Sequence, residues 1–215
     1  MKDQKAISGY RYSDATHSCA HSYLMPAVNA ELLNVKERFK GRDARLFDLG
    51  CGNGSVAASI TKLGWEVTGV DPSSEGISAA GKMYPELLLK EGSAYDDLVS
   101  VYGRFPVVVS LEVVEHVYAP REYARTLFDL VEPGGTAIIS TPYHGYFKNL
   151  ALAISGKMDR HSTALWDHGH IKFWSTPTLT ALLEEAGFVE IRFARVGRIP
   201  PLAKSMIAIA HKPKT

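Results

Sequence analysis

From Arg45 onward, short apolar runs alternate with longer amphipathic segments. This pattern is typical of strand–helix–strand units whose sheet is covered on both faces. The apolar runs predict five parallel strands, at Arg45–Gly50, Trp65–Asp71, Glu86–Gly92, Phe105–Ser110 and Gly135–Ser140. The segments between them predict helices at Gly54–Gly64, Pro72–Tyr84 and Pro120–Gly135. We therefore expect an α/β domain with a doubly wound, Rossmann-like sheet.

The C-terminal part adds a helix and two strands to this pattern. Ser175 or Thr176 is expected to cap a helix that has Pro177 in its first turn and ends at Gly187. Residues 188–196 and 203–212 predict the two strands. Because the linker between them, residues 197–201, is too short for a parallel crossover, the last strand should run antiparallel to the rest. The complete sheet is then seven-stranded.

The 215 residues fit one domain with three parts. Residues 1–41 are expected to form a helical N-terminal cap, with its clearest helix at Pro26–Phe39. Residues 42–140 are expected to form the cofactor-binding half, and residues 141–215 an acceptor-side insertion and the closing strands. Within the insertion, Tyr146–Ile154 predicts a short amphipathic helix. We expect its apolar face to pack on the core, and contact with a membrane surface is the alternative.

Charge and cysteine content narrow the class of protein. The formal net charge is +1, from 24 basic and 23 acidic residues, which argues against a nucleic-acid partner. The two cysteines, Cys19 and Cys51, do not suggest a disulfide-stapled fold, and no apolar stretch resembles a signal peptide or a membrane span. A cytoplasmic enzyme or binding protein is expected.

The strongest chemical signal is the glycine-rich segment Asp48–Gly54, which lies between a predicted strand and a helix. Glycines at such a turn let the backbone approach a ligand closely, although a tight turn without a ligand is the simpler interpretation. Asp71 ends the next strand about 20 residues on, where a carboxylate can bind ribose hydroxyls. Ser55 stands where dinucleotide-binding loops have a third glycine or alanine, which disfavours NAD.

The sequence from Arg42 to the C-terminus resembles the class I S-adenosylmethionine-dependent methyltransferases. The features that carry the resemblance are the Asp-x-Gly-x-Gly-x-Gly loop, Asp71 and the expected antiparallel last strand. The resemblance implies S-adenosylmethionine as cofactor and S-adenosylhomocysteine as product. Ser93 replaces the usual acid of the adenine-binding segment; Asp96 or Asp97 could substitute, or the segment could only cap a helix. The implied cofactor contacts are Asp48, Gly50, Cys51, Gly52, Asn53, Gly54, Asp71, Pro72, Ser73, Ser93, Ala94, Tyr95, Ser110, Leu111 and Glu112.

A second motif, Glu112-Val-Val-Glu115-His116, follows the fourth predicted strand. If it continues as a helical turn, the two carboxylates and the imidazole share one face. The motif is similar to that of the ubiquinone-biosynthesis O-methyltransferases, which implies a divalent cation at Glu112, Glu115 and His116. It is also similar to that of the small-RNA 2′-hydroxyl methyltransferases, where a histidine placed like His170 implies a further ligand. Two imidazoles would favour Mn²⁺ or Zn²⁺ over Mg²⁺. The alternative is a helix cap with a packed histidine.

Histidines are the candidate general bases for methylation of a hydroxyl group. They are His116, His144, His168 and His170. The family resemblance implies a small apolar or aromatic acceptor, with at most peripheral membrane contact. A nucleic-acid 2′-hydroxyl methyltransferase is a second hypothesis, because a similar Glu-x-x-Glu-His set occurs there with a histidine placed like His170. A non-catalytic protein that binds S-adenosylmethionine is the third.

Overall fold

The computed structural model describes residues 21–38, 44–162, 164–167 and 169–214. In this part of the chain a seven-stranded sheet has the order β3-β2-β1-β4-β5-β7-β6. The strands are β1 (Arg45–Leu49), β2 (Glu66–Asp71), β3 (Leu88–Glu91), β4 (Phe105–Leu111), β5 (Val131–Pro142), β6 (Val189–Val196) and β7 (Ser205–His211). Strands β1 to β5 are parallel, and β7 is antiparallel to both β5 and β6. The predicted fold class and the antiparallel last strand are confirmed.

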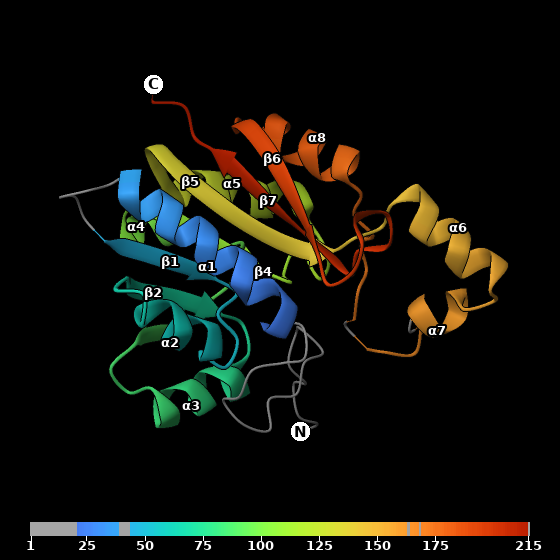
Figure 1. The fold of residues 1–215 in the computed structure, drawn as a ribbon. Helices are drawn as coiled ribbons and strands as arrows, with labels where there is room; N and C mark the ends of the chain where they lie inside the picture. The colour runs from blue at the N-terminus through green and yellow to red at the C-terminus, as the bar shows by residue number, and fades with distance from the viewer. Residues whose placement is uncertain (1–20, 39–43, 163, 168, 215) are drawn as a thin grey trace.

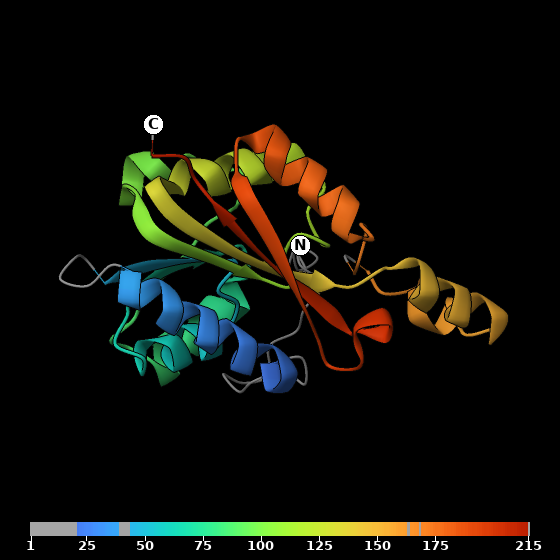
Figure 2. The same ribbon diagram turned by 45° about the horizontal axis from the view of Figure 1, so that its top comes forward.

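Helices cover both faces of the sheet. They are α1 (His21–Arg38), α2 (Ser55–Thr61), α3 (Ser74–Met83), α4 (Leu98–Tyr102), α5 (Pro120–Leu130), α6 (Tyr146–Ile154), α7 (Met158–Ser162) and α8 (Thr176–Ala186), with a 3₁₀ turn, η1 (Pro200–Leu202). Figures 1 and 2 show α1, α2 and α3 on one face and α4, α5 and α8 on the other. Helices α6 and α7 project from the end of β5, away from these layers.

The strands place apolar side chains on both faces. Phe47 and Val108 are buried under the α5 side, while Leu46 and Val107, their neighbours in sequence, are buried under the α1 side. Strand β4 is buried along its whole length, and its sequence is therefore a nearly continuous apolar run. This two-sided core fixes the carboxyl ends of the parallel strands, where ligands bind in such sheets.

Helix α8 begins and ends as the sequence predicts. Ser175 is the N-cap and forms a reciprocal capping box with Thr178, and Pro177 lies in the first turn. Gly187 closes the helix with φ of 106°, a left-handed conformation that glycine adopts without strain.

Helix α5 is shorter than predicted. It ends at Leu130, and β5 starts at once with Val131, which pairs with Phe105 of β4. The prediction of a helix as far as Gly135 is therefore wrong, because residues 131–135 belong to strand β5. Gly134 lies where the register between β4 and β5 shifts, and it takes a left-handed φ of 79°.

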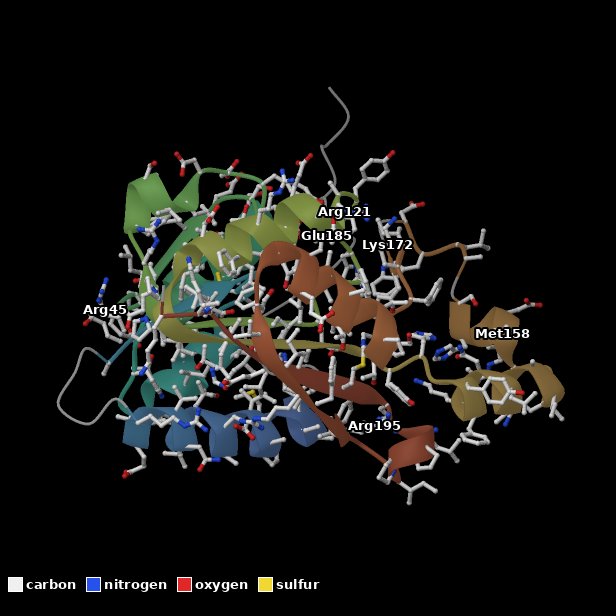
Figure 3. The ribbon with its side chains drawn as sticks, turned by 90° about the horizontal axis from the view of Figure 1, so that it is seen from above. Arg45, Arg121, Met158, Lys172, Glu185 and Arg195 are labelled. Carbon is white, nitrogen blue, oxygen red and sulfur yellow. The ribbon has the colours of Figure 1, made fainter. Side chains whose placement is uncertain are left out.

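The prediction that α6 packs on the core is also wrong. None of its residues is buried, and its aromatic side chains Tyr146 and Phe147 are 75% and 66% exposed. Together with α7, which the sequence pattern did not predict, it forms an arm; Figure 3 shows Met158 of α7 on this arm, far from Arg45 at the opposite end of the sheet. None of the helices described is both long and apolar enough to cross a bilayer.

Candidate active site

The glycine loop is folded back onto the second strand. The backbone N–H groups of Gly50 and Cys51 both donate to the carbonyl of Val70, at 2.8 and 3.0 Å. Gly50 has φ of 92°, and a Cβ there would overlap the side chain of Val113 from the turn after β4. A glycine is therefore required at position 50 for both its backbone conformation and its close packing. The same contact places the loop directly against the Glu112–His116 segment.

Asp71, at the end of β2, closes the other side of the loop. Its Oδ2 accepts the N–H of Gly52 at 2.9 Å, and its Oδ1 accepts the N–H of Ser73 at 2.8 Å. Burial raises the pKa of Asp71, and the two N–H donors oppose that shift. Each carboxylate oxygen can accept a second hydrogen bond, so Asp71 is placed to bind hydroxyl groups at the carboxyl end of the sheet. Ser73 caps α3 by accepting the N–H of Gly76.

Asp48 lies behind the loop and is 2% exposed. Burial, and next the negative charge of Asp71, raise the pKa of Asp48 to about 7. Its Oδ2 is buried and has no hydrogen-bond partner among the described residues; the same is true of Oγ of Ser55. Buried polar atoms without a partner are rare, so these oxygens fit a site that a polar ligand completes.

The segment predicted to bracket adenine forms a tight local turn. Oγ of Ser93 accepts the N–H of Tyr95 at 3.2 Å, and the Asp96 carboxylate accepts the N–H of Ser93 at 2.7 Å. The hydroxyl of Tyr95 accepts the N–H of Ala119 at 3.1 Å, which links this turn to the start of α5. The N-cap of α4 is Asp97, so Ser93 does not cap that helix. Its role toward adenine stays a prediction.

The Glu112–His116 segment is a turn and not a helix, since the next helix, α5, starts at Pro120. The condition under which Glu112, Glu115 and His116 would share one helical face is therefore not met. Glu112 has a left-handed φ of 56°, and its Oε1 accepts the hydroxyl of Ser140 at 2.8 Å. Its Oε2 lies 3.5 Å from the hydroxyl of Ser205. These contacts hold the Glu112 carboxyl at β5 and β7.

Three other residues do come together. Ligand atoms of Glu115, His116 and His170 all lie within 4.8 Å of one another, and Glu112 is not in this group. The side chain of Glu115 is 1% exposed, and neither carboxylate oxygen has a hydrogen-bond partner in the described chain. Burial, and next the charge of Glu112, raise the pKa of Glu115 well above its usual value. A buried carboxyl of this kind needs either a proton or a cation.

The histidines form two neighbouring groups. In the first, the rings of His116 and His170 are 4.8 Å apart, and burial together with the nearby imidazoles lowers the pKa of His170 to about 4. In the second, His144 lies 5.2 Å from His161 and 4.9 Å from Phe173, and burial lowers its pKa to about 4. His170 and His144 are therefore neutral at pH 7, and the same burial makes each ring a weaker base than an ordinary imidazole. His168 lies outside the described residues.

The segment from Gly169 to Trp174 is joined to the Glu115 turn by contacts that no sequence pattern predicts. The N–H groups of Ile171 and Lys172 both donate to the carbonyl of Glu115, at 2.9 and 3.0 Å. The indole N–H of Trp174 donates to the carbonyl of Val114 at 3.0 Å. These bonds join residues more than 50 positions apart, and backbone acceptors leave no pattern in the sequence.

Residues 21–191 match the family of methyltransferase domains. This chain belongs to the S-adenosylmethionine-dependent methyltransferases. A ubiquinone biosynthesis O-methyltransferase of Ruegeria pomeroyi is 32% identical over 177 residues, which cover 79% of this chain and 70% of that protein. One of Caulobacter sp. (strain K31) is 39% identical over 127 residues, 57% of this methyltransferase chain and 49% of the relative.

Solved structures agree at the level of the fold. A SAM-dependent methyltransferase from Archaeoglobus fulgidus has a TM-score of 0.61 at 18% identity, over 87% of this chain and 94% of that one. Another from Methanosarcina mazei has a TM-score of 0.63 at 17% identity, over 84% and 98% of the two chains. The methyltransferase fold thus extends over most of the chain, whereas some curated relatives are matched over only about half of their length.

Proposed function

We propose that this methyltransferase transfers a methyl group from S-adenosylmethionine to a hydroxyl oxygen of a small apolar or aromatic acceptor. The observation that carries the proposal is the buried cluster of Glu115, His116 and His170, because removal of a proton is what makes a hydroxyl a good nucleophile. The names of the Ruegeria and Caulobacter relatives support transfer to oxygen. A nucleic-acid acceptor has less support, since the net charge is only +1.

The residues of the glycine loop fit the proposed cofactor. When bound, S-adenosylmethionine supplies a methyl group on a positively charged sulfur. Asp71 would accept hydrogen bonds from the ribose hydroxyls, and the partnerless Oδ2 of Asp48 offers a further acceptor beside it. Gly50 and Gly54, at φ of 92° and 76°, give the loop its shape, because a Cβ at either position would strike Val113 or Leu89. These residues bind and orient, which is the main contribution an enzyme makes to in-line transfer.

His116 and His170 are the proposed bases where no cation is bound, and His144 is the proposed base where a cation occupies the lone pairs of those two rings. The pKa of His170 is lowered to about 4, so its ring is uncharged and holds a lone pair at neutral pH. His144, packed on Phe173 and His161, would form part of the acceptor wall together with these aromatic rings. The predicted role of His168 remains a prediction.

We also propose that Glu115, His116 and His170 hold a divalent cation. The donor set fits, because two imidazoles and a buried carboxylate that has no hydrogen-bond partner among the described residues suit Zn²⁺ or Mn²⁺. A cation there would lower the pKa of the acceptor hydroxyl and orient its oxygen. In this proposal Glu112 is not a ligand. Its carboxyl contacts the hydroxyls of Ser140 and Ser205 and so holds the turn against β5 and β7.

The proposed reaction predicts transfer to a phenolic oxygen. The purified chain, incubated with isotopically labelled S-adenosylmethionine and catechols that carry an alkyl chain, is expected to give a labelled methyl ether. Mass spectrometry identifies the site of the label. The matched control acceptor has both hydroxyls replaced by hydrogen, and it should gain no label. Label found only on amine or carbon acceptors would contradict transfer to oxygen.

We further propose that α6 contacts a membrane surface. Tyr146, Phe147, Leu150 and Ile154 lie within one helical face of α6, and all four are exposed. A helix whose apolar face points to solvent needs a covering partner. Lys157 and Arg160 on the same arm outnumber its one acid, Asp159, and this excess of positive charge favours the surface of an anionic bilayer. Such a surface would bring lipid-tailed acceptors to the arm.

This arm predicts binding to anionic vesicles. Burying a phenylalanine or isoleucine side chain contributes about 2 kcal/mol. The double variant Phe147→Ser/Ile154→Ser should therefore sediment with phosphatidylglycerol vesicles at least roughly tenfold more weakly than the wild type. Tyr118→Ser, which removes an aromatic that is 83% exposed on the body of the domain, is the control. If the arm instead joins two copies, the wild type will be a dimer that ignores vesicles, and the proposal fails.

A further inference from the structure

The ring of His116 makes a contact that selects one of its two neutral forms. Its Nδ1 lies 3.1 Å from the backbone carbonyl oxygen of Gly169. A carbonyl oxygen only accepts, so Nδ1 must carry the proton in this hydrogen bond. The lone pair of the neutral ring is then on Nε2, and Nε2 is the atom that His116 can offer to a cation or to an acceptor proton.

The Gly169 carbonyl is held in place from both sides. The N–H of Gly169 donates to the carbonyl of Trp166 at 3.0 Å, which closes a tight turn before it. After it, the N–H groups of Ile171 and Lys172 donate to the carbonyl of Glu115. Because Glu115 precedes His116, the segment that carries Gly169 is anchored beside the ring that it contacts.

Position 169 also has no room for a side chain. The backbone of Gly169 is not in the left-handed region, so the requirement is one of space. A Cβ there would lie 2.8 Å from Cδ2 and Cε3 of Trp166, closer than real Cβ contacts allow. The Trp166 ring packs on His116 and His170 with centroids 5.7 and 5.2 Å away, so a movement of this ring would disturb both histidines. An added methyl group would therefore displace the carbonyl, the histidine rings or both.

We infer that the Gly169 carbonyl is a positioning group that fixes His116 in the Nδ1–H form and so presents Nε2 to the reaction. By this inference, a residue outside the Glu-x-x-Glu-His motif orients one histidine of the Glu115, His116 and His170 cluster. Its use in catalysis rests on the proposed function, but the hydrogen bond itself can be measured on the resting protein. Gly169 touches no reacting group in this scheme and acts only through His116.

The direct test is the protonation state of the His116 ring. Long-range proton–nitrogen correlation spectra of the metal-free protein, at mildly alkaline pH where an ordinary imidazole is neutral, should show His116 with its proton on Nδ1. Gly169→Ala should shift the ring toward a mixture of both neutral forms. Gly81→Ala is the control, because a Cβ at Gly81 meets nothing within 4 Å. A wild-type ring with its proton on Nε2, or an unchanged ring in Gly169→Ala, would overturn the inference.

A second variant separates displacement of the carbonyl from general damage to the fold. In Trp166→Ala/Gly169→Ala the indole that a Cβ would strike is gone, so the Nδ1–H signal should return toward that of the wild type. If Gly169→Ala alone does not fold, this double variant still decides the matter, because it must retain the Nδ1–H form while the carbonyl stays in place. A double variant that folds and shows the other form contradicts the inference.

Calorimetric titration with Zn²⁺ or Mn²⁺ then connects the hydrogen bond to the cluster. Changing a partner of a ligating histidine typically costs 10- to 100-fold in metal affinity, and we expect Gly169→Ala to fall in that range. If the wild type binds neither ion while its ring is in the Nδ1–H form, the cation proposal fails and the positioning inference stands. Unchanged affinity in a variant whose ring has lost the Nδ1–H form removes the proposed link to the cation.

Discussion

Glu115→Gln is expected to abolish methyl transfer, and excess chelator should do the same to the wild-type protein. The carboxyl of Glu115 is fully buried beside two imidazoles and has no hydrogen-bond partner in the part of the chain that is described. A cation bound there would contribute its charge to activation of the acceptor hydroxyl. We expect turnover to fall at least roughly 100-fold, and added Zn²⁺ or Mn²⁺ to restore the chelated wild type but not the variant.

Glu112→Gln is the matched control, since it makes the same chemical change three residues earlier in the same turn. The amide oxygen of glutamine can still accept the Ser140 hydroxyl, which bonds to Glu112 at 2.8 Å. The cluster of Glu115, His116 and His170 does not include this side chain. Because the charge of Glu112 is one cause of the raised pKa of Glu115, Glu112→Gln should change metal affinity, but by much less than Glu115→Gln, which removes a ligand. Full activity in excess chelator would contradict the cation proposal. Glu115 and His116 would then have only a structural role, as a buried turn with a packed histidine.

The layered fold is readable from the sequence because its signals are local. Each strand is a short apolar run, and the cap of α8 needs only Ser175, Pro177 and Gly187 at their fixed spacing. The direction of β7 follows from the shortness of the linker before it. The predicted end of α5 was wrong because the choice between helix and strand after Leu130 depends on the pairing of Val131 with Phe105, which is 26 positions away.

The geometry of the site depends on contacts that local patterns do not encode. Spacing alone suggested that Glu112 joins Glu115 and His116, yet hydroxyls of Ser140 and Ser205 hold its carboxyl elsewhere. Nothing in the sequence marks either serine as a partner. The orientation of α6 is a similar case. Periodicity shows that the helix has an apolar face, but whether that face meets the core or the solvent depends on where the arm leaves β5.

Asp71→Ala is expected to weaken binding of S-adenosylmethionine by about 2 kcal/mol, or roughly 30-fold, with the fold intact. The substitution removes a carboxylate that can accept two hydroxyl protons. It also frees the N–H groups of Gly52 and Ser73, which Asp71 now holds at 2.9 and 2.8 Å. Loss of those bonds loosens the loop and adds to the effect. Calorimetric titration of the purified chain with the cofactor or its demethylated product measures the change.

Two comparisons make this measurement specific. Asp71→Asn keeps an oxygen acceptor for one backbone N–H but removes the charge, so it should bind with intermediate affinity. Glu91→Ala removes an exposed acid from the neighbouring strand, paired in register with Asp71, and should change nothing. NAD should fail to compete, because Ser55 occupies the position where a pyrophosphate needs glycine or alanine. Unchanged affinity in a folded Asp71→Ala protein would place the ribose elsewhere, and tight binding of NAD would contradict the choice of cofactor.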